Sequence, residues 1–126
     1  MKGVKRPWGS FKRFALNEVC TVKILELKPK AMLSLQVHKK RNEEWYFFDK
    51  ALVQIGNEVK KVRPGEIVKI KKGKMHRVMA GWKKVRFLEI SRGKFDEKDE
   101  MNFKQSTLLE EITKPFTSHS FTSSQY

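Results

Sequence analysis

Cysteine, long apolar runs and acidic charge are all scarce in this chain of 126 residues. The single cysteine, Cys20, cannot form an internal disulfide, which predicts a reducing compartment and therefore a cytoplasmic protein. No segment approaches the roughly 18 consecutive apolar residues that a membrane-spanning helix requires. Residues 1–8 are basic but lead into no apolar run, which argues against a secretory signal. The sequence thus predicts neither a membrane nor a secreted protein.

Basic residues outnumber acidic ones by 28 to 14, which gives a net charge of +14. Such an excess suits an anionic partner, for example nucleic acid, anionic lipid or a phosphorylated small molecule. The lysines are scattered, and no recognition helix or base-stacking motif is visible, so we do not expect a nucleic-acid-binding protein. An apolar share of 39% and this length predict a single domain with a real core.

Short runs of β-forming residues, separated by turn residues, fill the first three-quarters of the chain. Residues 21–27 are mostly β-branched or aliphatic, and residues 51–55 and 58–62 flank Gly56-Asn57, a typical hairpin turn. No apolar pattern with the 3.6-residue period of a helix is sustained before residue 96. The pattern predicts an all-β sandwich or barrel. Further strands are expected at 44–48, 67–70, 76–80 and 85–90.

The character of the chain changes at Asp96, where a run of charged residues begins. Residues 106–112 favour one short helix, and residues 113–126 are rich in serine and threonine, which is typical of an irregular tail. We therefore divide the chain into a barrel over residues 1–95 and a C-terminal extension over residues 96–126.

Four polar residues within the predicted strands could form a metal site. Gln36 and His38 are two residues apart, so on a strand both side chains point to the same face. Glu43 follows at the start of an aromatic strand, and His76 begins another. An amide oxygen, two imidazoles and a carboxylate suit Zn, Mn, Fe, Co or Ni. On spacing alone, the two histidines fit equally well as unrelated residues on a polar surface.

A set of short motifs adds to this pattern: Arg-Pro-Trp-Gly-Ser-Phe at 6–11, Leu-Ser-Leu-Gln-Val-His at 33–38, Arg-Asn-Glu-Glu-Trp at 41–45, Gly-Lys-Met-His-Arg at 73–77 and Leu-Glu-Ile-Ser-Arg-Gly at 88–93. Their order and separation resemble the cupin domain of type II mannose-6-phosphate isomerases, which also occurs fused behind mannose-1-phosphate guanylyltransferases. The resemblance covers roughly residues 5–95. It implies a double-stranded β-helix (the cupin or jelly-roll barrel) and interconversion of mannose 6-phosphate and fructose 6-phosphate. It further implies one divalent metal ion on Gln36, His38, Glu43 and His76, and a homodimer.

Roles for other residues follow from the chemistry that the resemblance implies. An aldose–ketose isomerase moves a proton between neighbouring carbons, and the candidate base is either Glu89 on the last core strand or a lysine with a lowered pKa at the mouth of the barrel. Glu89 could instead orient a ligand histidine. Arg77, within a ligand motif, is assigned with Glu89 to catalysis. Arg41, Lys23 and Arg92 are assigned to binding of the sugar phosphate, although each cation could equally be a solvated surface residue.

The sequence departs from the family pattern at three places. Asp49-Lys50-Ala51 stands where the first motif usually ends in glycine, and Lys71-Lys72 stands where a Pro-Ala pair is usual. Phe103 stands where family members carry an arginine. These departures keep open two alternatives: an isomerase or epimerase acting on another sugar phosphate or nucleotide sugar, and a non-catalytic sugar-binding cupin.

The remaining distinctive side chains have no predicted role in chemistry. Trp8 and Trp45 lie within motifs of the family, and large aromatics of this kind are expected to pack in the core. Cys20 has no basic or histidine neighbour in sequence and is expected to be inert.

Overall fold

Every element that the computed structural model describes is a β-strand, which confirms the all-β prediction. The described residues are 1–93 and 101–103, so the helix predicted at 106–112 and the irregular tail lie outside them. No helix in the described part is long and apolar enough to cross a membrane. The strands are β1 (Lys2–Arg6), β2 (Gly9–Arg13), β3 (Cys20–Leu27), β4 (Leu35–Val37), β5 (Arg41–Phe47), β6 (Ala51–Ile55), β7 (Glu58–Val62), β8 (Ile67–Ile70), β9 (His76–Met79), β10 (Val85–Gly93) and β11 (Met101–Phe103).

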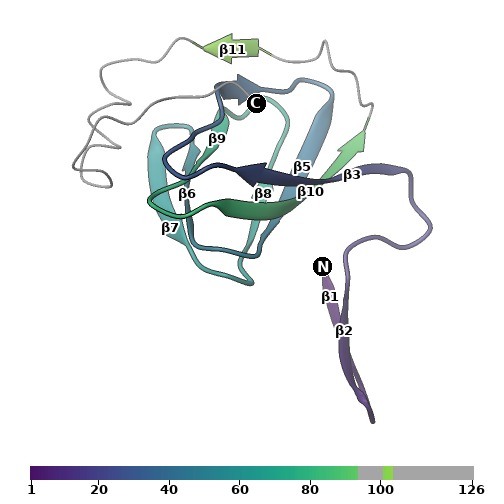
Figure 1. The fold of residues 1–126 in the computed structure, drawn as a ribbon. Coiled ribbons are helices and arrows are strands. Elements are labelled where there is room, and N and C mark those ends of the chain that lie inside the picture. Colours follow the sequence, from purple (N-terminus) through teal and green to yellow (C-terminus); the bar gives the residue numbers. More distant parts are fainter. Residues whose placement is uncertain (94–100, 104–126) are drawn as a thin grey trace.

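Two antiparallel sheets form the barrel (Figure 1). One sheet has the order β3-β10-β5-β8 and the other the order β11-β4-β9-β6-β7. Strands that are far apart in the sequence are therefore neighbours: β10 lies between β3 and β5, and β9 lies between β4 and β6. The segment assigned to the C-terminal extension contributes β11, which pairs with β4.

The core fills the space between the two sheets with the inward side chains of both. Phe47 and Phe87 stack at 5.2 Å between ring centroids, and the Trp45 ring meets Phe87 edge-on at 5.6 Å. All three are buried, as the alternation along β5 and β10 requires. Aliphatic residues of both sheets complete this core: Leu27, Val53, Val62, Val68, Ile70, Val78 and Val85.

Glycine makes two of the predicted turns possible. Gly56 has a φ of 59° in the turn between β6 and β7, and Gly65 has a φ of 89° between β7 and β8. Residues other than glycine rarely adopt these backbone angles, because their Cβ atom would clash with the neighbouring carbonyl oxygen. The hairpin predicted around Gly56-Asn57 is confirmed, with Ala51 opposite Val62 at its open end.

The first two strands form a separate hairpin that the sequence analysis did not predict. β1 and β2 pair only with each other in the described part of the chain, and Val4 lies opposite Phe11. Figure 1 shows this hairpin projecting away from the barrel. Trp8 lies in its turn and is 73% exposed, so the prediction that Trp8 packs in the core is wrong. The prediction for Trp45, which is 1% exposed, is confirmed.

Candidate metal centre

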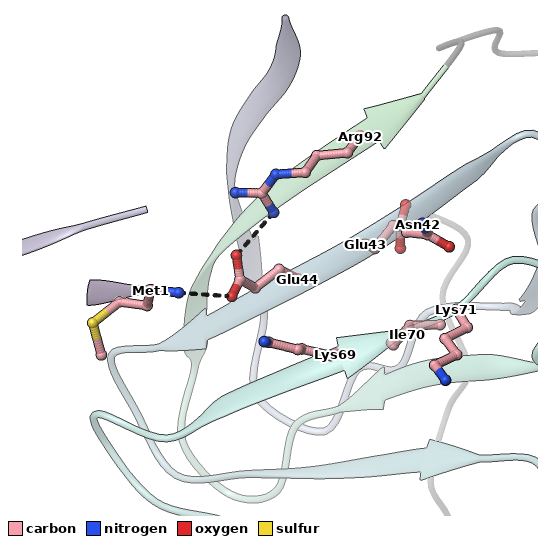
Figure 2. Close-up of a pocket in the computed structure, with 8 residues that line it drawn as sticks. All are labelled: Met1, Asn42, Glu43, Glu44, Lys69, Ile70, Lys71 and Arg92. Atoms are coloured by element: carbon pink, nitrogen blue, oxygen red, sulfur yellow. Dashed lines mark hydrogen bonds and ion pairs between the residues drawn. The ribbon is translucent and has the colours of Figure 1, made fainter. Parts of the chain in front are cut away.

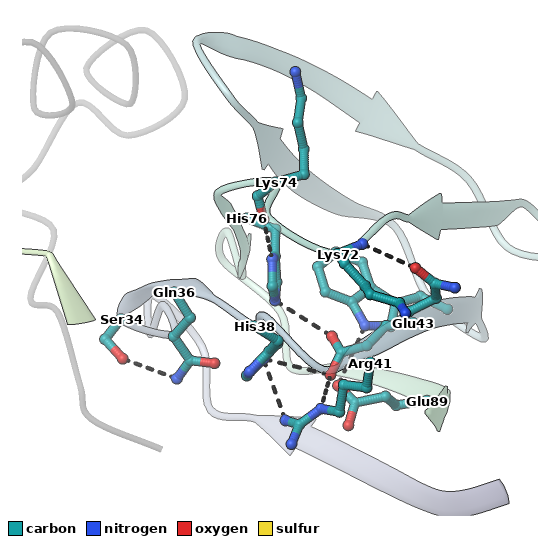
Figure 3. A network of polar contacts seen from close by, with 11 residues as sticks. Ser34, Gln36, His38, Arg41, Glu43, Lys72, Lys74, His76 and Glu89 are labelled. Atoms are coloured by element: carbon teal, nitrogen blue, oxygen red, sulfur yellow. Dashed lines mark hydrogen bonds and ion pairs between the residues drawn. The ribbon is translucent and has the colours of Figure 1, made fainter. Parts of the chain in front are cut away.

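Three potential metal ligands from two sheets meet inside the barrel (Figure 3). Glu43 lies on β5, His76 begins β9, and His38 directly follows β4. The Glu43 carboxylate is 3.5 Å from His38 Nε2 through Oε2, and 3.3 Å from His76 Nε2 through Oε1. All three side chains are buried, and one ligand atom from each lies within 4.8 Å of the others. The spacing in the sequence therefore corresponds to a real cluster.

The cluster directs free electron pairs of nitrogen and oxygen atoms at a common point, as a metal ion requires of its ligands. His76 Nδ1 is 2.8 Å from the Lys74 carbonyl, which accepts a hydrogen bond only if Nδ1 carries the proton. In the neutral ring, Nε2 then directs its lone pair at the cluster. Glu43 Oε1 and His76 Nε2 are both buried without a hydrogen-bond partner. Two facing acceptors of this kind fit a divalent ion, as do the imidazole and carboxylate ligand types.

The charge of Glu43 is stabilised by its neighbours. Burial alone would raise the pKa of this carboxyl, but the close contact with His76, together with His38 and Arg41, holds the pKa below its ordinary value. Glu43 is therefore ionised at neutral pH, which is the form that binds a metal ion.

Arg41 lies directly beside the ligands. Its Nε donates to Glu43 Oε2 at 3.2 Å, and its Nη2 lies 3.2 Å from His38 Nε2. The side chain is buried, so the guanidinium is part of the interior and is not a solvated surface group. A cation here can compensate the Glu43 carboxylate and can bind an anionic substrate bidentately.

Gln36 lies on the same face of the sheet as the cluster, but its amide group forms a hydrogen bond with Ser34. It lies opposite His76 in the β4–β9 pairing, which directs both side chains to the same side of the sheet. Its amide nitrogen donates to Ser34 Oγ at 3.1 Å. The structure therefore brings Gln36 next to the cluster, while His38, Glu43 and His76 form its centre.

Glu89 also points into the barrel (Figure 3). Burial raises the pKa of Glu89 to about 7, and the negative charge of Glu43 adds to this effect. The Trp45 indole donates to Glu89 Oε2 at 3.3 Å, and Lys23, which lies opposite Glu89 in the β3–β10 pairing, also favours the charged form. The site thus contains a carboxyl group that can change its protonation state near neutral pH.

The structure does not bring Arg77 to this cluster. Arg77 follows His76 directly on β9, and successive strand residues point to opposite faces, so its side chain lies on the outer face of the five-stranded sheet. There Arg77 Nη1 lies 2.5 Å from Met32 Sδ, and burial lowers the pKa of the guanidinium to about 10. The geometry therefore gives no support to the predicted catalytic role of Arg77.

Arg92 also lies away from the cluster. Its guanidinium pairs with Glu18 at 3.1 Å and Glu44 at 3.0 Å, and it also donates to the Phe14 carbonyl. These contacts attach the segment after β2 to the outer face of the four-stranded sheet. Arg92 thus has a structural role in this fold, and its predicted contact with substrate stays a prediction.

Two residues of this interior had no predicted part in the site. Ser91 lies opposite Glu43 in the β5–β10 pairing, and its buried hydroxyl has no hydrogen-bond partner. Trp45 was assigned to packing, but its indole also bonds Glu89. Strand alternation from Glu89 would have placed Ser91 on the same face, whereas the Trp45 contact depends on the pairing of two strands distant in sequence.

A cavity of about 330 Å³ lies beside β5 and β8 but does not coincide with the cluster (Figure 2). Of the three central ligands, only Glu43 contributes to its lining. Glu44 also lines the cavity, where it forms ion pairs with Arg92 and with the Met1 amino group. Its other lining residues are Asn42, Lys69, Ile70 and Lys71.

The fold and the site together define a cupin, a double-stranded β-helix with a His/Glu cluster inside the barrel. An uncharacterised conserved protein with a double-stranded β-helix domain from Klebsiella pneumoniae superposes with a TM-score of 0.60 at 19% identity, covering 68% of this chain and 76% of that one. A variant of oxalate decarboxylase from B. subtilis superposes with a TM-score of 0.61 at 26% identity, over 69% of this chain and 25% of that one. These likenesses confirm the predicted fold class.

The chain belongs to the family described as mannose-6-phosphate isomerase C-terminal, whose model matches residues 1–105. It is 31% identical over 100 residues to the xanthan biosynthesis protein XanB of Xanthomonas campestris. That match covers 78% of this chain but only 21% of XanB, so the chain spans about a fifth of the length of this relative. The predicted family resemblance is confirmed.

Proposed function

We propose that this cupin is a metal-dependent aldose–ketose isomerase that interconverts mannose 6-phosphate and fructose 6-phosphate. The observation that carries the proposal is the pairing of a three-ligand cluster with Glu89, a buried carboxyl whose pKa is about 7, inside one barrel. A cluster without an ionisable neighbour could bind metal but would leave proton transfer to solvent.

The ligand set supports a divalent ion of the Zn, Mn, Fe, Co or Ni group. His38, Glu43 and His76 would hold it, with Gln36 as a further amide ligand if its bond to Ser34 is released. When bound, such an ion supplies Lewis acidity that favours ionisation of a hydroxyl next to a carbonyl. Three central protein ligands would leave positions open for the substrate oxygens.

Proton transfer is assigned to Glu89. As a carboxylate, it removes the proton from carbon 2 of the open-chain aldose, and the carbonyl oxygen at carbon 1 takes up the proton of the neighbouring hydroxyl at carbon 2. Glu89 then returns its proton to carbon 1 while the oxygen at carbon 2 becomes the ketone carbonyl. A pKa of about 7 suits both steps, because the group can accept and release a proton at neutral pH.

Cations in the same interior would hold the charged substrate. Arg41 lies within hydrogen-bond distance of His38 and Glu43, and Lys23 lies opposite Glu89. Both belong to elements that face the barrel interior, so a phosphate entering there would meet two positive charges. The remaining positive charge of the chain would steer an anionic substrate towards the protein.

A coupled assay tests the proposal directly. Metal-loaded protein should convert mannose 6-phosphate to fructose 6-phosphate, and Glu89→Gln should lose at least about 100-fold in kcat while still binding metal. Lys61→Glu, on the exposed surface of β7, is the matched control and should retain full activity. Metal-loaded wild-type protein that binds the sugar phosphate without converting it would favour the non-catalytic alternative.

A further inference from the structure

Ser91 is a buried polar residue that the proposed proton transfer does not use. It is 1% exposed, and its hydroxyl has no hydrogen-bond partner in the described part of the chain. A buried hydroxyl without a partner destabilises a fold, because it has lost its bonds to water and gained none in exchange. Such a group indicates a partner that the described residues do not supply.

The sheet places Ser91 between the cluster and the proposed base. Ser91 lies directly opposite Glu43 in the β5–β10 pairing, and Glu89 precedes it by two residues on the same face of β10. The Cβ atoms of directly paired residues are about 5 Å apart, and residues two apart on one strand are separated by about 7 Å. A sugar whose reacting carbons lie between the cluster and Glu89 therefore has its next carbon beside Ser91.

The inward residues of β10 become smaller towards the end of the strand. The side chains decrease in size from Phe87 through Glu89 to Ser91. Gly93 is the last residue and lies opposite Arg41, where it presents no side chain at all. At the end of the barrel that holds the ligands, the hydroxyl of Ser91 is therefore the last side-chain group that β10 offers to a bound molecule.

Polar side chains continue from β10 to β3, whereas the opposite side of the sheet is apolar. Thr21 lies opposite Ser91, and Lys23 lies opposite Glu89, in the β3–β10 pairing. On the other side, β8 contributes Ile70, which is 3% exposed and belongs to the core. Hydroxyl groups and a cation suit the hydroxylated carbon chain of a sugar phosphate, so the strip of Ser91, Thr21 and Lys23 fits the part of the substrate that does not react.

We propose that Ser91 is a specificity-determining residue that binds the hydroxyl at carbon 3 of the sugar, next to the two reacting carbons. The inference rests on the proposed isomerase function and names the substrate group that the site reads. A serine hydroxyl can both donate and accept, so it can pair with a sugar hydroxyl in either sense. A site of this kind rejects an analogue that lacks the hydroxyl, because the serine would then stay buried without a partner.

Binding of a substrate and its deoxy analogue tests this role without turnover. Fructose 6-phosphate and 3-deoxyfructose 6-phosphate are titrated calorimetrically into Zn²⁺-loaded Glu89→Gln protein, where the first should bind about 10-fold more tightly. When Ser91→Ala is added, the two sugars should bind within about 3-fold of each other. Ser91→Thr, which keeps the hydroxyl, should retain the preference. Ser10→Ala, at an exposed serine on β2, is the matched control and should leave the preference unchanged.

The pattern of losses separates recognition of the hydroxyl from a structural role. Circular dichroism and Zn²⁺ titration should give the same fold and metal affinity with and without Ser91→Ala. A preference that survives Ser91→Ala overturns the proposal, and so does an equal loss of affinity for both sugars. Failure of the proposed function looks different: Zn²⁺-loaded protein with Ser91 intact then binds neither sugar phosphate, and the role of Ser91 falls with it.

Discussion

At the scale of single residues, the interior of the barrel is organised around Glu43. This carboxylate contacts His38, His76 and Arg41, and its charge raises the pKa of Glu89. Each neighbour therefore depends on the ionisation of Glu43, and removal of one member should change the behaviour of the others.

His76→Ala should weaken binding of Zn²⁺ or Mn²⁺ at least about 100-fold, because it removes a ligand whose Nε2 is oriented by the Lys74 carbonyl. Gln36→Leu should cost less than about 10-fold, because the Gln36 amide bonds Ser34. Isothermal titration calorimetry on metal-stripped protein measures both. Equal losses in the two variants would show that Gln36 is a full ligand.

Glu89 should make stability depend on pH. Its pKa is raised from 4.5 to about 7 in the folded protein, so its contribution is fully present below about pH 4.5 and is lost as pH rises through about 7. Relative to Glu89→Gln, the metal-free wild type should lose on the order of 3 kcal/mol of unfolding free energy across this window. Urea unfolding at a series of pH values measures the difference.

Bound metal should lower the upper limit of this window. A divalent ion beside Glu43 cancels the negative charge that helps to raise the pKa of Glu89. Relative to Glu89→Gln at the same saturating Zn²⁺, the wild type should therefore show a smaller loss of stability that is complete at lower pH than in the metal-free protein. An unchanged window would place the ion away from Glu43.

At the scale of elements, β10 connects most of the features described. It pairs with β3 on one side and β5 on the other, and its inward residues include Phe87, Glu89 and Ser91. Its last residue, Gly93, lies opposite Arg41, so the end of β10 determines how closely β5 approaches at the site.

Gly93→Ala should destabilise the protein by about 2 kcal/mol or more. Gly93 has a φ of 111°, and a Cβ atom there would lie 2.5 Å from the Lys40 carbonyl oxygen, which is backbone and cannot move aside cheaply. Gly65→Ala is the matched control: its φ of 89° is also strained, but the added Cβ meets no atom within 4 Å. Chemical denaturation should show the larger loss for Gly93→Ala, and equal losses would exclude the clash as the cause.

At the scale of the whole molecule, one aromatic cluster supports both the core and the site. Trp45 packs edge-on against Phe87 in the core and against His76 at 5.5 Å, and its indole also bonds Glu89. The geometry of the cluster of ligands thus rests on the packing between the two sheets.

Phe87→Ala should lower the free energy of unfolding by about 3–5 kcal/mol, because Phe87 is fully buried and contacts both Phe47 and Trp45. Phe87→Leu retains most of the volume and should cost less than about 1.5 kcal/mol. Thermal and urea unfolding measure both variants. A cost for Phe87→Ala near that of Phe87→Leu would mean that the barrel relaxes to fill the space.

The sequence by itself predicted the all-β class, most of the barrel strands, the Gly56 turn and the three residues that meet in the His/Glu cluster, His38, Glu43 and His76. These features depend on local alternation, on turn residues and on motifs, all of which can be read along the chain. The amino-terminal hairpin, with Val4 opposite Phe11, was missed because its strands are short and mostly basic and lack strict alternation.

Only the tertiary structure decided which side chains meet. Arg77 contacts Met32, which lies 45 residues earlier in the chain, so its surroundings depend on the pairing of distant segments. Arg92 serves as an anchor because Glu18, Glu44 and Phe14, which are distant in sequence, converge on it. The raised pKa of Glu89 likewise requires burial and the charge of Glu43 across the β5–β10 pairing. Burial and long-range pairing arise only when the two sheets close on each other, so composition and spacing could not supply them.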